Sequence, residues 1–187
     1  MTDKIFIGAQ ELLEDSYNLA HKILDNGFKP NYIVGIWRGG TPIGIAVQEL
    51  LDYRGSPSDH IAIRTSSYKG INEQYNKIRV HGLHYIIENV NADDKLLIVD
   101  DTFDSGRSVD AVIQTIRKLS RANTPNVIKV ATVYYKPTMR VVDFEPDFYL
   151  RTTDKWLVFP HELKGLSDAE IEKYKSFAFP QGIHKSN

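Results

Sequence analysis

The sequence predicts an α/β fold with a mostly parallel central sheet flanked by helices, and three observations lead to this prediction. Short apolar segments of strand length alternate with segments of helical periodicity along the 187 residues. Charged or glycine-rich residues follow several of the apolar segments directly, as expected where parallel strands end at one edge of a sheet. No internal repeat or low-complexity linker interrupts the alternation, so we expect one domain over residues 1–187.

The helices are predicted from apolar spacing and from their end signals. An apolar stripe within residues 13–24 precedes Asn26-Gly27, a C-terminal stop. Pro42 suits the first turn of a helix over residues 42–51. A third helix is expected over residues 109–119, and the capping box that begins at Ser167 predicts a fourth, to about Phe177.

The strands are predicted from short apolar or β-branched runs. We expect them at residues 32–36, 61–64, 95–99, 126–135, 148–151 and 156–159. Residues 66–77 are polar and contain Gly70, which favours a mobile loop. Three chemically distinctive segments each follow a predicted strand, and we therefore expect them to converge on one edge of the sheet: 38–40, 100–108 and 136–137.

Composition excludes several functional classes. The net charge of −1 gives no sign of a nucleic-acid surface or a polybasic membrane patch, and no apolar run is long enough to cross a bilayer. The first residues lack the pattern of a secretory signal. The chain has no cysteine, which excludes disulfides and thiolate chemistry and suits the cytoplasm. Its six histidines lack tight metal-ligand spacing.

The segment from Leu96 to Ser108 carries the most chemical information. A buried strand ends in Asp100 and Asp101, which can accept hydrogen bonds from vicinal hydroxyls or orient a cation such as Mg²⁺. The sequence Asp-Ser-Gly-Arg-Ser over 104–108 then leads into a helix, whose exposed N–H groups favour a phosphate. A capping loop with solvated acids is the alternative; it is favoured for any one of these residues taken alone, whereas the ordered set favours the ligand site.

A second anion site is indicated by Arg38-Gly39-Gly40 at the next strand-to-helix junction, although such a turn also occurs as a simple connection. The chain has neither a P-loop nor a dinucleotide-binding glycine pattern. A response-regulator receiver also has a strand that ends in two aspartates, but there the pair lies near the start of the domain. Here about half of the chain precedes the pair.

Residues 99–108 resemble the phosphoribosyl-pyrophosphate (PRPP) signature of the type I phosphoribosyltransferases. Residues 38–40 resemble the pyrophosphate loop of that family, and residues 66–68 resemble the start of its catalytic loop. Lys136-Pro137, residues 146–148 and residues 154–156 resemble the base-binding region of the 6-oxopurine branch, which includes hypoxanthine-guanine and xanthine-guanine phosphoribosyltransferases. The resemblance implies a small hood from about 136–162 plus the terminal segments, and a mobile loop at about 66–77.

The resemblance also implies a role for each matching residue. The expected PRPP-binding residues are Asp100, Asp101, Thr102, Phe103, Asp104, Ser105, Gly106, Arg107, Ser108, Arg38, Gly39, Gly40, Ser67 and Tyr68. Asp104 would be catalytic, managing the proton near the purine N7. Lys136, Trp156 and Leu157 would bind the purine, and Asp100, Asp101 and Glu162 would hold Mg²⁺. Glu162 stands where aspartate is usual, and Arg107 where lysine or glycine is common.

Two of the purine-side residues also have a reading from their chemistry alone. The ammonium of Lys136 only donates, so it can satisfy a 6-oxo group but not a 6-amino group. The ring of Trp156 offers a flat face on which a purine could stack, and an ordinary core tryptophan is the alternative.

The sequence thus predicts a purine salvage enzyme that uses PRPP and a 6-oxopurine, works in the cytoplasm and forms a homo-oligomer, a dimer or a tetramer, as relatives do. Two alternatives stay open. One is a regulator of the same fold that senses PRPP or nucleotides, and the other is a phosphoribosyltransferase for adenine or a pyrimidine. Which 6-oxopurine is preferred is not determined by these residues.

Overall fold

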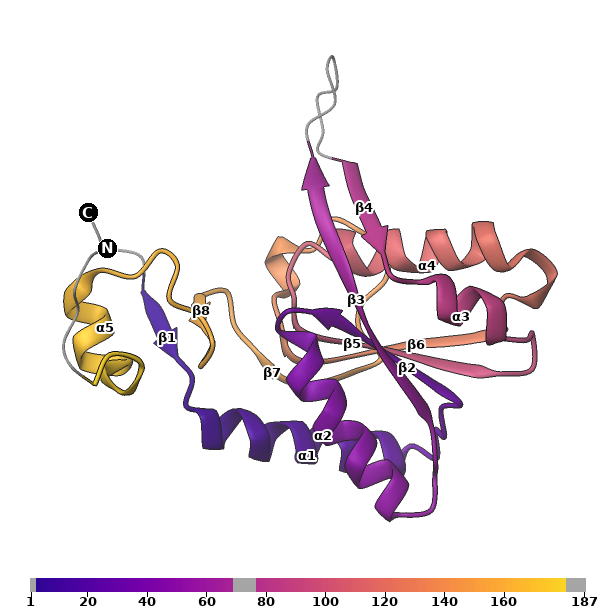
Figure 1. Cartoon of the computed structure of the whole chain (residues 1–187), viewed down its shortest axis with the longest axis horizontal. Helices are drawn as coiled ribbons and strands as arrows, with labels where there is room; N and C mark the ends of the chain where they lie inside the picture. The colour runs from indigo at the N-terminus through magenta and orange to yellow at the C-terminus, as the bar shows by residue number, and fades with distance from the viewer. Residues whose placement is uncertain (1–2, 69–76, 181–187) are drawn as a thin grey trace. The chain divides into compact units, whose positions relative to one another are not determined.

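The computed structural model describes residues 3–68 and 77–180 (Figure 1). Its contacts divide the chain into two compact units. The larger unit comprises residues 13–154, and the smaller one combines residues 1–12 with residues 155–187. The expected hood at 136–162 is therefore divided between them at residue 155.

A six-stranded sheet forms the centre of the larger unit, in the order β4-β3-β2-β5-β6-β7. Its strands are β2 (Tyr32–Trp37), β3 (Asp59–Tyr68), β4 (Lys77–His81), β5 (Lys95–Phe103), β6 (Val127–Tyr135) and β7 (Phe148–Thr152). All neighbours pair in parallel except β3 and β4, which confirms the mostly parallel sheet. The strands β2, β5 and β6 lie side by side, so their carboxyl ends meet at one edge.

Helices cover both faces of this sheet (Figure 1). The helix α2 (Gly40–Tyr53) packs on one face, while α3 (His84–Asn89) and α4 (Arg107–Ser120) cover the other. The helix α4 buries Val109, Val112, Ile113 and Ile116, the spacing of an amphipathic helix. Together with alternate residues of the central strands, these side chains form the main hydrophobic core.

The helix α1 (Ala9–Asp25) is present where expected, but its buried apolar face is Leu12, Leu19, Ala20 and Ile23, whereas Leu13 and Tyr17 of the predicted stripe are exposed. The buried Asp15 of α1 accepts two hydrogen bonds from Arg151 on β7, at 2.8 and 3.0 Å. Short 3-10 turns, η1 (Arg121–Asn123) and η2 (Pro137–Met139), follow α4 and β6. Among the helices of residues 3–68 and 77–180, none is long and apolar enough to cross a membrane.

The structure corrects the expected loop at residues 66–77 at both of its ends. Residues 66–68 continue β3, and Lys77 begins β4, because the two segments form an antiparallel ladder that pairs Ser66 with Arg79 and Ser67 with Ile78. Polar side chains do not prevent such pairing, since it is made by the main chain. Residues 69–76 of the expected loop lie outside the described residues. The strand β5 also extends beyond its predicted end, so Asp100 and Asp101 are strand residues.

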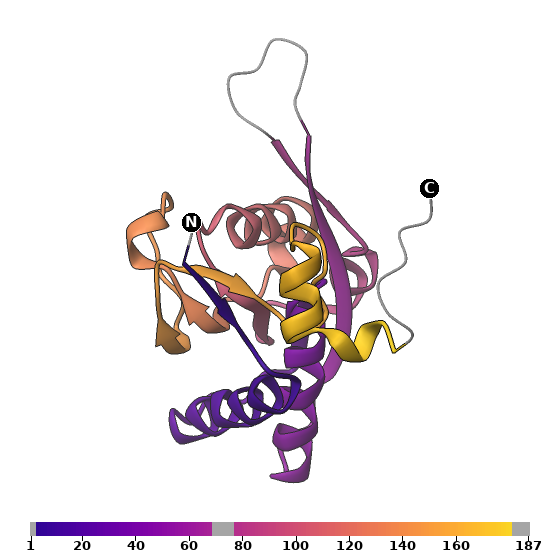
Figure 2. The same cartoon turned by 90° about the vertical axis from the view of Figure 1, so that its left-hand side faces the viewer.

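The smaller unit contains β1 (Lys4–Phe6), β8 (Trp156–Val158), α5 (Asp168–Tyr174) and the 3-10 turn η3 (Ser176–Ala178). The strands β1 and β8 pair in parallel. The predicted capping box is present at Ser167, and α5 lies beside β1, as Figure 2 shows. Lys4 forms an ion pair with Glu170 at 2.7 Å, and the Phe6 ring stacks on Tyr174.

Candidate functional site

Three loops of the larger unit meet at the carboxyl edge of the parallel strands, as the sequence predicts. They follow β2, β5 and β6, and contacts in the structure connect them. The glycines after β2 pack on the acidic end of β5, and the residue after β6 reaches Asp104 beyond β5. The convergence is therefore a physical contact among the three segments.

The Arg38-Gly39-Gly40 turn is pressed against β5. A Cβ atom on Gly39 would lie 1.6 Å from Asp101 Oδ2, and one on Gly40 would lie 2.3 Å from the carbonyl oxygen of Val99. Neither position tolerates a side chain without movement, because real Cβ contacts do not fall below 3.0 Å. The Arg38 side chain is exposed at the start of α2, and the peptide bond that precedes it is cis.

The two adjacent aspartates differ in environment. Burial and the negative charge of Asp101 raise the pKa of Asp100 well above its usual value, although the Asp101 N–H, which donates to Asp100 Oδ1 at 2.9 Å, opposes this. The Asp101 side chain lies against Gly39 of the β2 loop. Hydroxyl donors or a cation placed here would relieve the repulsion between the two carboxylates. Their hard oxygen atoms are ligands that Mg²⁺ prefers, so the donor set fits the expected metal.

The turn from Asp104 to Ser108 forms the start of α4. Gly106 has a φ of 77°, in the left-handed region, and an added Cβ would lie 2.4 Å from Val142 Cγ2. Glycine is therefore required both by the backbone and by the space. The carbonyl of Ser105 accepts the N–H of Val141 at 3.1 Å, and Ser105 Oγ lies 3.5 Å from the N–H of Arg107. The N-terminus of this 14-residue helix suits a phosphate group.

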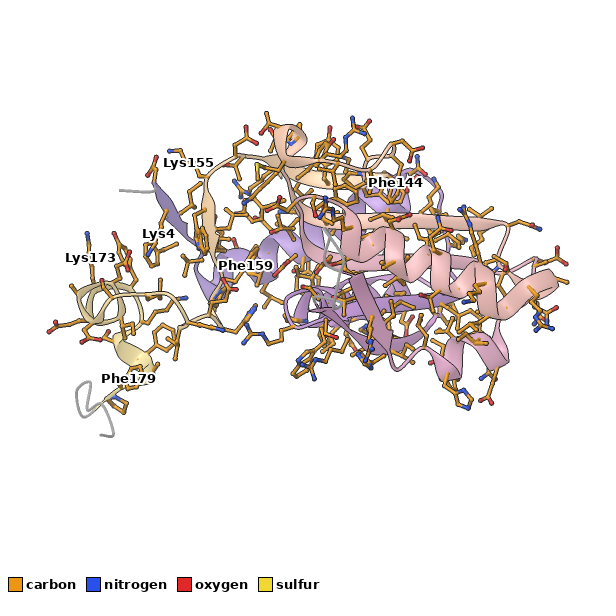
Figure 3. The ribbon with its side chains drawn as sticks, turned by 90° about the horizontal axis from the view of Figure 1, so that it is seen from above. Lys4, Phe144, Lys155, Phe159, Lys173 and Phe179 are labelled. Carbon is orange, nitrogen blue, oxygen red and sulfur yellow. The ribbon has the colours of Figure 1, made fainter. Side chains whose placement is uncertain are left out.

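Two expected PRPP-binding residues have side chains turned into the protein. Phe103 is buried, with edge-to-face contacts to Tyr135 and to Phe144, which is labelled in Figure 3. Its carbonyl accepts the N–H of Lys136 at 2.9 Å, which joins the ends of β5 and β6. Within the described residues, the buried hydroxyl of Thr102 has no hydrogen-bond partner. Only the main chain of Phe103 is available to a ligand.

Lys136 and Asp104 form an ion pair across this edge, with 3.5 Å between Nζ and Oδ2. The Lys136 side chain is 13% exposed and that of Asp104 is 47% exposed. The parallel pairing of β5 with β6 produces this contact, because the two residues directly follow the paired ends Phe103 and Tyr135. A cation held in a mostly buried position next to a half-exposed carboxylate can donate to one part of a ligand while the carboxylate accepts from another.

The predicted catalytic-loop residues lie on β3. The Ser67 side chain is exposed at the position opposite Ile78. The side chain of Tyr68 and residues 69–76 lie outside the described residues.

The remaining predicted residues belong to the smaller unit. Trp156 is 56% exposed, so its ring is not a core tryptophan and has a free face. Leu157 is buried, which leaves only its main chain for a ligand. Glu162 Oε2 accepts the N–H of Phe159 at 3.1 Å, so one oxygen of this expected metal ligand caps the turn after β8.

Sequence reasoning did not single out Lys175. This residue is 2% exposed, and its Nζ donates to the carbonyl of Phe159 at 2.7 Å. Burial lowers the pKa of Lys175, and the negative charge of Glu162 opposes the shift. No local signal distinguishes this lysine from the solvated ones around it, since its burial comes from a contact 16 residues away.

Comparisons with known proteins agree with this arrangement. Residues 7–165 match the model of the phosphoribosyl transferase domain. Hypoxanthine-guanine phosphoribosyltransferase of Streptococcus pyogenes is 24% identical over 146 residues, which cover 78% of this chain and 76% of that protein. A purine phosphoribosyltransferase from Pyrococcus horikoshii is 28% identical with a TM-score of 0.71, covering 88% of this chain and 97% of that one.

A hypothetical protein from Neisseria gonorrhoeae, solved with bound ppGpp, has the same fold at 20% identity, with a TM-score of 0.74 and coverage of 95% and 98%. The PRPP-type signature, the glycine turn beside it and the match over residues 7–165 lead to one conclusion: the chain belongs to the phosphoribosyltransferase family, with the type I fold.

Proposed function

We propose that this protein is a purine salvage enzyme that transfers the 5-phosphoribosyl group from PRPP to a 6-oxopurine. The product is a nucleoside 5′-monophosphate, and pyrophosphate is released. The observation that carries the proposal is the ion pair of Lys136 with Asp104, 3.5 Å apart beside the acidic end of β5. An ammonium group only donates, so Lys136 satisfies a 6-oxo oxygen and leaves a 6-amino group unpaired.

In the proposed reaction, the bond from the ribose C1 to the pyrophosphate oxygen breaks and a bond from C1 to the purine N9 forms. Asp104 accepts the proton that the purine gives up at the N7 side, since its carboxylate is the more exposed member of the ion pair. Lys136 holds O6 of the same base. The ring of Trp156 stacks on the purine, and the main chain at Leu157 contacts its edge.

The phosphate-bearing substrate is assigned to the loops after β5 and β2. The start of α4, from Ser105 to Ser108, holds the 5′-phosphate, and Asp100 with Asp101 accepts the ribose hydroxyls. Arg38 and the two glycines face the pyrophosphate. Ser67 and Tyr68 begin a segment that closes over the substrates and excludes water, which would otherwise hydrolyse the activated ribose.

Mg²⁺ is proposed as the cofactor, held by Asp100, Asp101 and Glu162. When bound, it neutralises charge on the departing pyrophosphate. The support is the oxygen donor set and the raised pKa of Asp100, which marks a pair of carboxylates that a cation would stabilise. We further propose that the enzyme is a cytoplasmic homo-oligomer.

The relatives support the purine assignment by name. The Streptococcus pyogenes protein is a hypoxanthine-guanine phosphoribosyltransferase, and the Pyrococcus horikoshii structure is a purine phosphoribosyltransferase.

The test measures pyrophosphate release with PRPP, Mg²⁺ and one base at a time: hypoxanthine, guanine, xanthine, adenine and uracil. We expect release with at least one 6-oxopurine and none with adenine or uracil. Lys136→Met should lower kcat/KM for the 6-oxopurine by about tenfold or more, the cost of one hydrogen bond to a charged group. Lys118→Met, an exposed lysine of α4, is the matched control and should change nothing.

Each alternative function has its own result in this assay. Activity with adenine or a pyrimidine alone would replace the proposed base and show that Lys136 does not select it. Tight binding of PRPP or a nucleotide without turnover of any base would instead indicate a sensor of the same fold.

A further inference from the structure

Lys175 is a buried lysine in the smaller unit that the proposed reaction does not use. Its side chain is 2% exposed, and its Nζ donates to the carbonyl of Phe159 at 2.7 Å. Phe159, the residue directly after β8, is labelled in Figure 3. Burying an ammonium group costs free energy unless the group is paired and hydrogen-bonded, so the contact with Phe159 is needed to stabilise Lys175 in this position.

The partner of Lys175 is a turn that is itself closed by hydrogen bonds. The N–H of Glu162 donates to the Phe159 carbonyl at 3.0 Å, so that oxygen accepts from both the main chain and Lys175. In the other direction, Glu162 Oε2 accepts the N–H of Phe159 at 3.1 Å. The carboxylate of Glu162 also supplies the negative charge that faces Lys175. The ammonium therefore sits on a defined turn, residues 159–162.

This turn follows directly after β8, which carries Trp156 and Leu157. The strand β8 is only three residues long, and it pairs with one strand, β1, among the described residues. So short a strand has few hydrogen bonds to hold its direction. A contact that holds the turn 159–162 therefore also helps to hold Trp156 and Leu157 in position.

Lys175 directly follows the C-terminal end of α5, and separate contacts hold the N-terminal half of this helix. Its capping box at Ser167 involves Glu170, and the Glu170 carboxylate also forms the ion pair with Lys4 of β1. Lys175 follows the last residue of the helix, where the helix dipole favours a cation, and its N–H donates to the carbonyl of Ile171 at 2.7 Å. The helix thus connects β1 to the turn after β8.

We propose that Lys175 is a positioning residue for the purine, holding the turn 159–162 so that the ring of Trp156 and the main chain of Leu157 are presented to the base. The assignment rests on the proposed function, because it needs Trp156 and Leu157 to contact a purine. It gives the C-terminal helix a role in base binding that does not require the helix to touch the substrate.

The kinetic test compares Lys175→Met, which keeps the length of the side chain but neither its charge nor its donor, with Lys4→Met. The second variant breaks the ion pair at the other end of α5, which is partly exposed and therefore contributes little, and it keeps every hydrogen bond that holds the turn. Without this charged hydrogen bond, the turn should occupy the position that presents Trp156 and Leu157 only about a tenth of the time. We therefore expect Lys175→Met to raise KM for the purine about tenfold, with KM for PRPP within about twofold. Lys4→Met should leave both values within about twofold.

A merely structural role would not separate the two substrates. If KM for the purine is unchanged in Lys175→Met, or if both KM values rise together, the proposal is wrong. If Lys175→Met does not fold, Lys175→Gln, whose shorter side chain keeps a donor, is measured for the same separation of KM values. A rise in both KM values there also overturns the proposal.

A second measurement does not depend on catalysis. The chain has two tryptophans, so in a Trp37→Phe background Trp156 is the only one. We expect Lys175→Met in that background to shift the emission maximum of Trp156 and its acrylamide quenching, and Lys4→Met to leave both unchanged. Unchanged emission in Lys175→Met refutes the role of Lys175. Wild-type protein without any purine activity refutes the proposed function, whatever the emission shows.

Discussion

Gly40 offers the sharpest test of how the loop after β2 is held against β5. A Cβ atom added there would lie 2.3 Å from the carbonyl oxygen of Val99 and 2.8 Å from Cα of Asp100. Ordinary contact begins at 3.4 Å, so the start of α2 and the end of β5 would have to separate by about 1 Å. Both atoms belong to the backbone of a central strand and cannot turn aside as a side chain can.

We therefore expect Gly40→Ala to lower the free energy of unfolding by about 2–3 kcal/mol, in the upper range for overpacking. The better helix propensity of alanine offsets at most about 1 kcal/mol of the gross cost. Gly39→Ala should behave differently, although its Cβ would overlap more closely, because the two worst contacts are with the Asp101 carboxylate, Oδ2 at 1.6 Å and Cγ at 2.2 Å, and Asp101 Cβ at 2.9 Å is close to the 3.0 Å limit. That carboxylate can rotate away, so stability falls less and PRPP binding falls more.

The assay is urea unfolding of both variants, together with KM for PRPP. Gly8→Ala is the matched control, since its nearest contact is 3.9 Å, and its stability should stay within about 0.5 kcal/mol of the wild type. Gly40→Ala with wild-type stability would refute the reasoning. So would equal losses of stability in Gly39→Ala and Gly40→Ala, because the argument depends on the difference between backbone and side-chain collisions.

Three other predictions concern single residues. Asp104→Asn should lower kcat while KM for PRPP is retained, and steady-state kinetics that showed the reverse would contradict the role of Asp104. Burial lowers the pKa of the His60 imidazole below its usual value of 6.5. As the pH falls below about 6.5, the unfolded chain therefore binds a proton at His60 before the folded chain does. The free energy of unfolding should decrease over this range, down to the pKa of His60 in the folded state. In His60→Leu, unfolding measured against pH should lose this part of the slope, and an unchanged slope would exclude His60 as its source. Arg151→Met removes the two hydrogen bonds that Arg151 donates to the buried carboxylate of Asp15. We expect the free energy of unfolding, measured by thermal unfolding, to fall by about 2–3 kcal/mol. This is less than for a fully buried pair, because Arg151 is half exposed. A loss below about 0.5 kcal/mol would show that water replaces the arginine.

Local signals were sufficient for much of the fold. The amphipathic spacing of α4 and the capping box of α5 each predicted the element found there, because helix formation depends on residues three or four positions apart. Elements that depend on distant partners were missed. The strand β1 has three residues and pairs with β8, more than 150 positions later, and β4 is defined by its ladder with β3. Polar residues 66–68 were expected in a loop for the same reason, since their pairing with β4 is made by the main chain.

The candidate site divides in the same way. The sequence by itself determined which donors and acceptors the segment from Asp100 to Ser108 offers: carboxylates at a strand end, then a glycine turn into a helix. Tertiary structure decided that Lys136 stands 3.5 Å from Asp104, that Phe103 points into the core and that Lys175 is buried on Phe159. The residue type and its near neighbours determine what a side chain can donate or accept. Which donor meets which acceptor depends on strand order and packing, and these bring together residues that no local pattern connects.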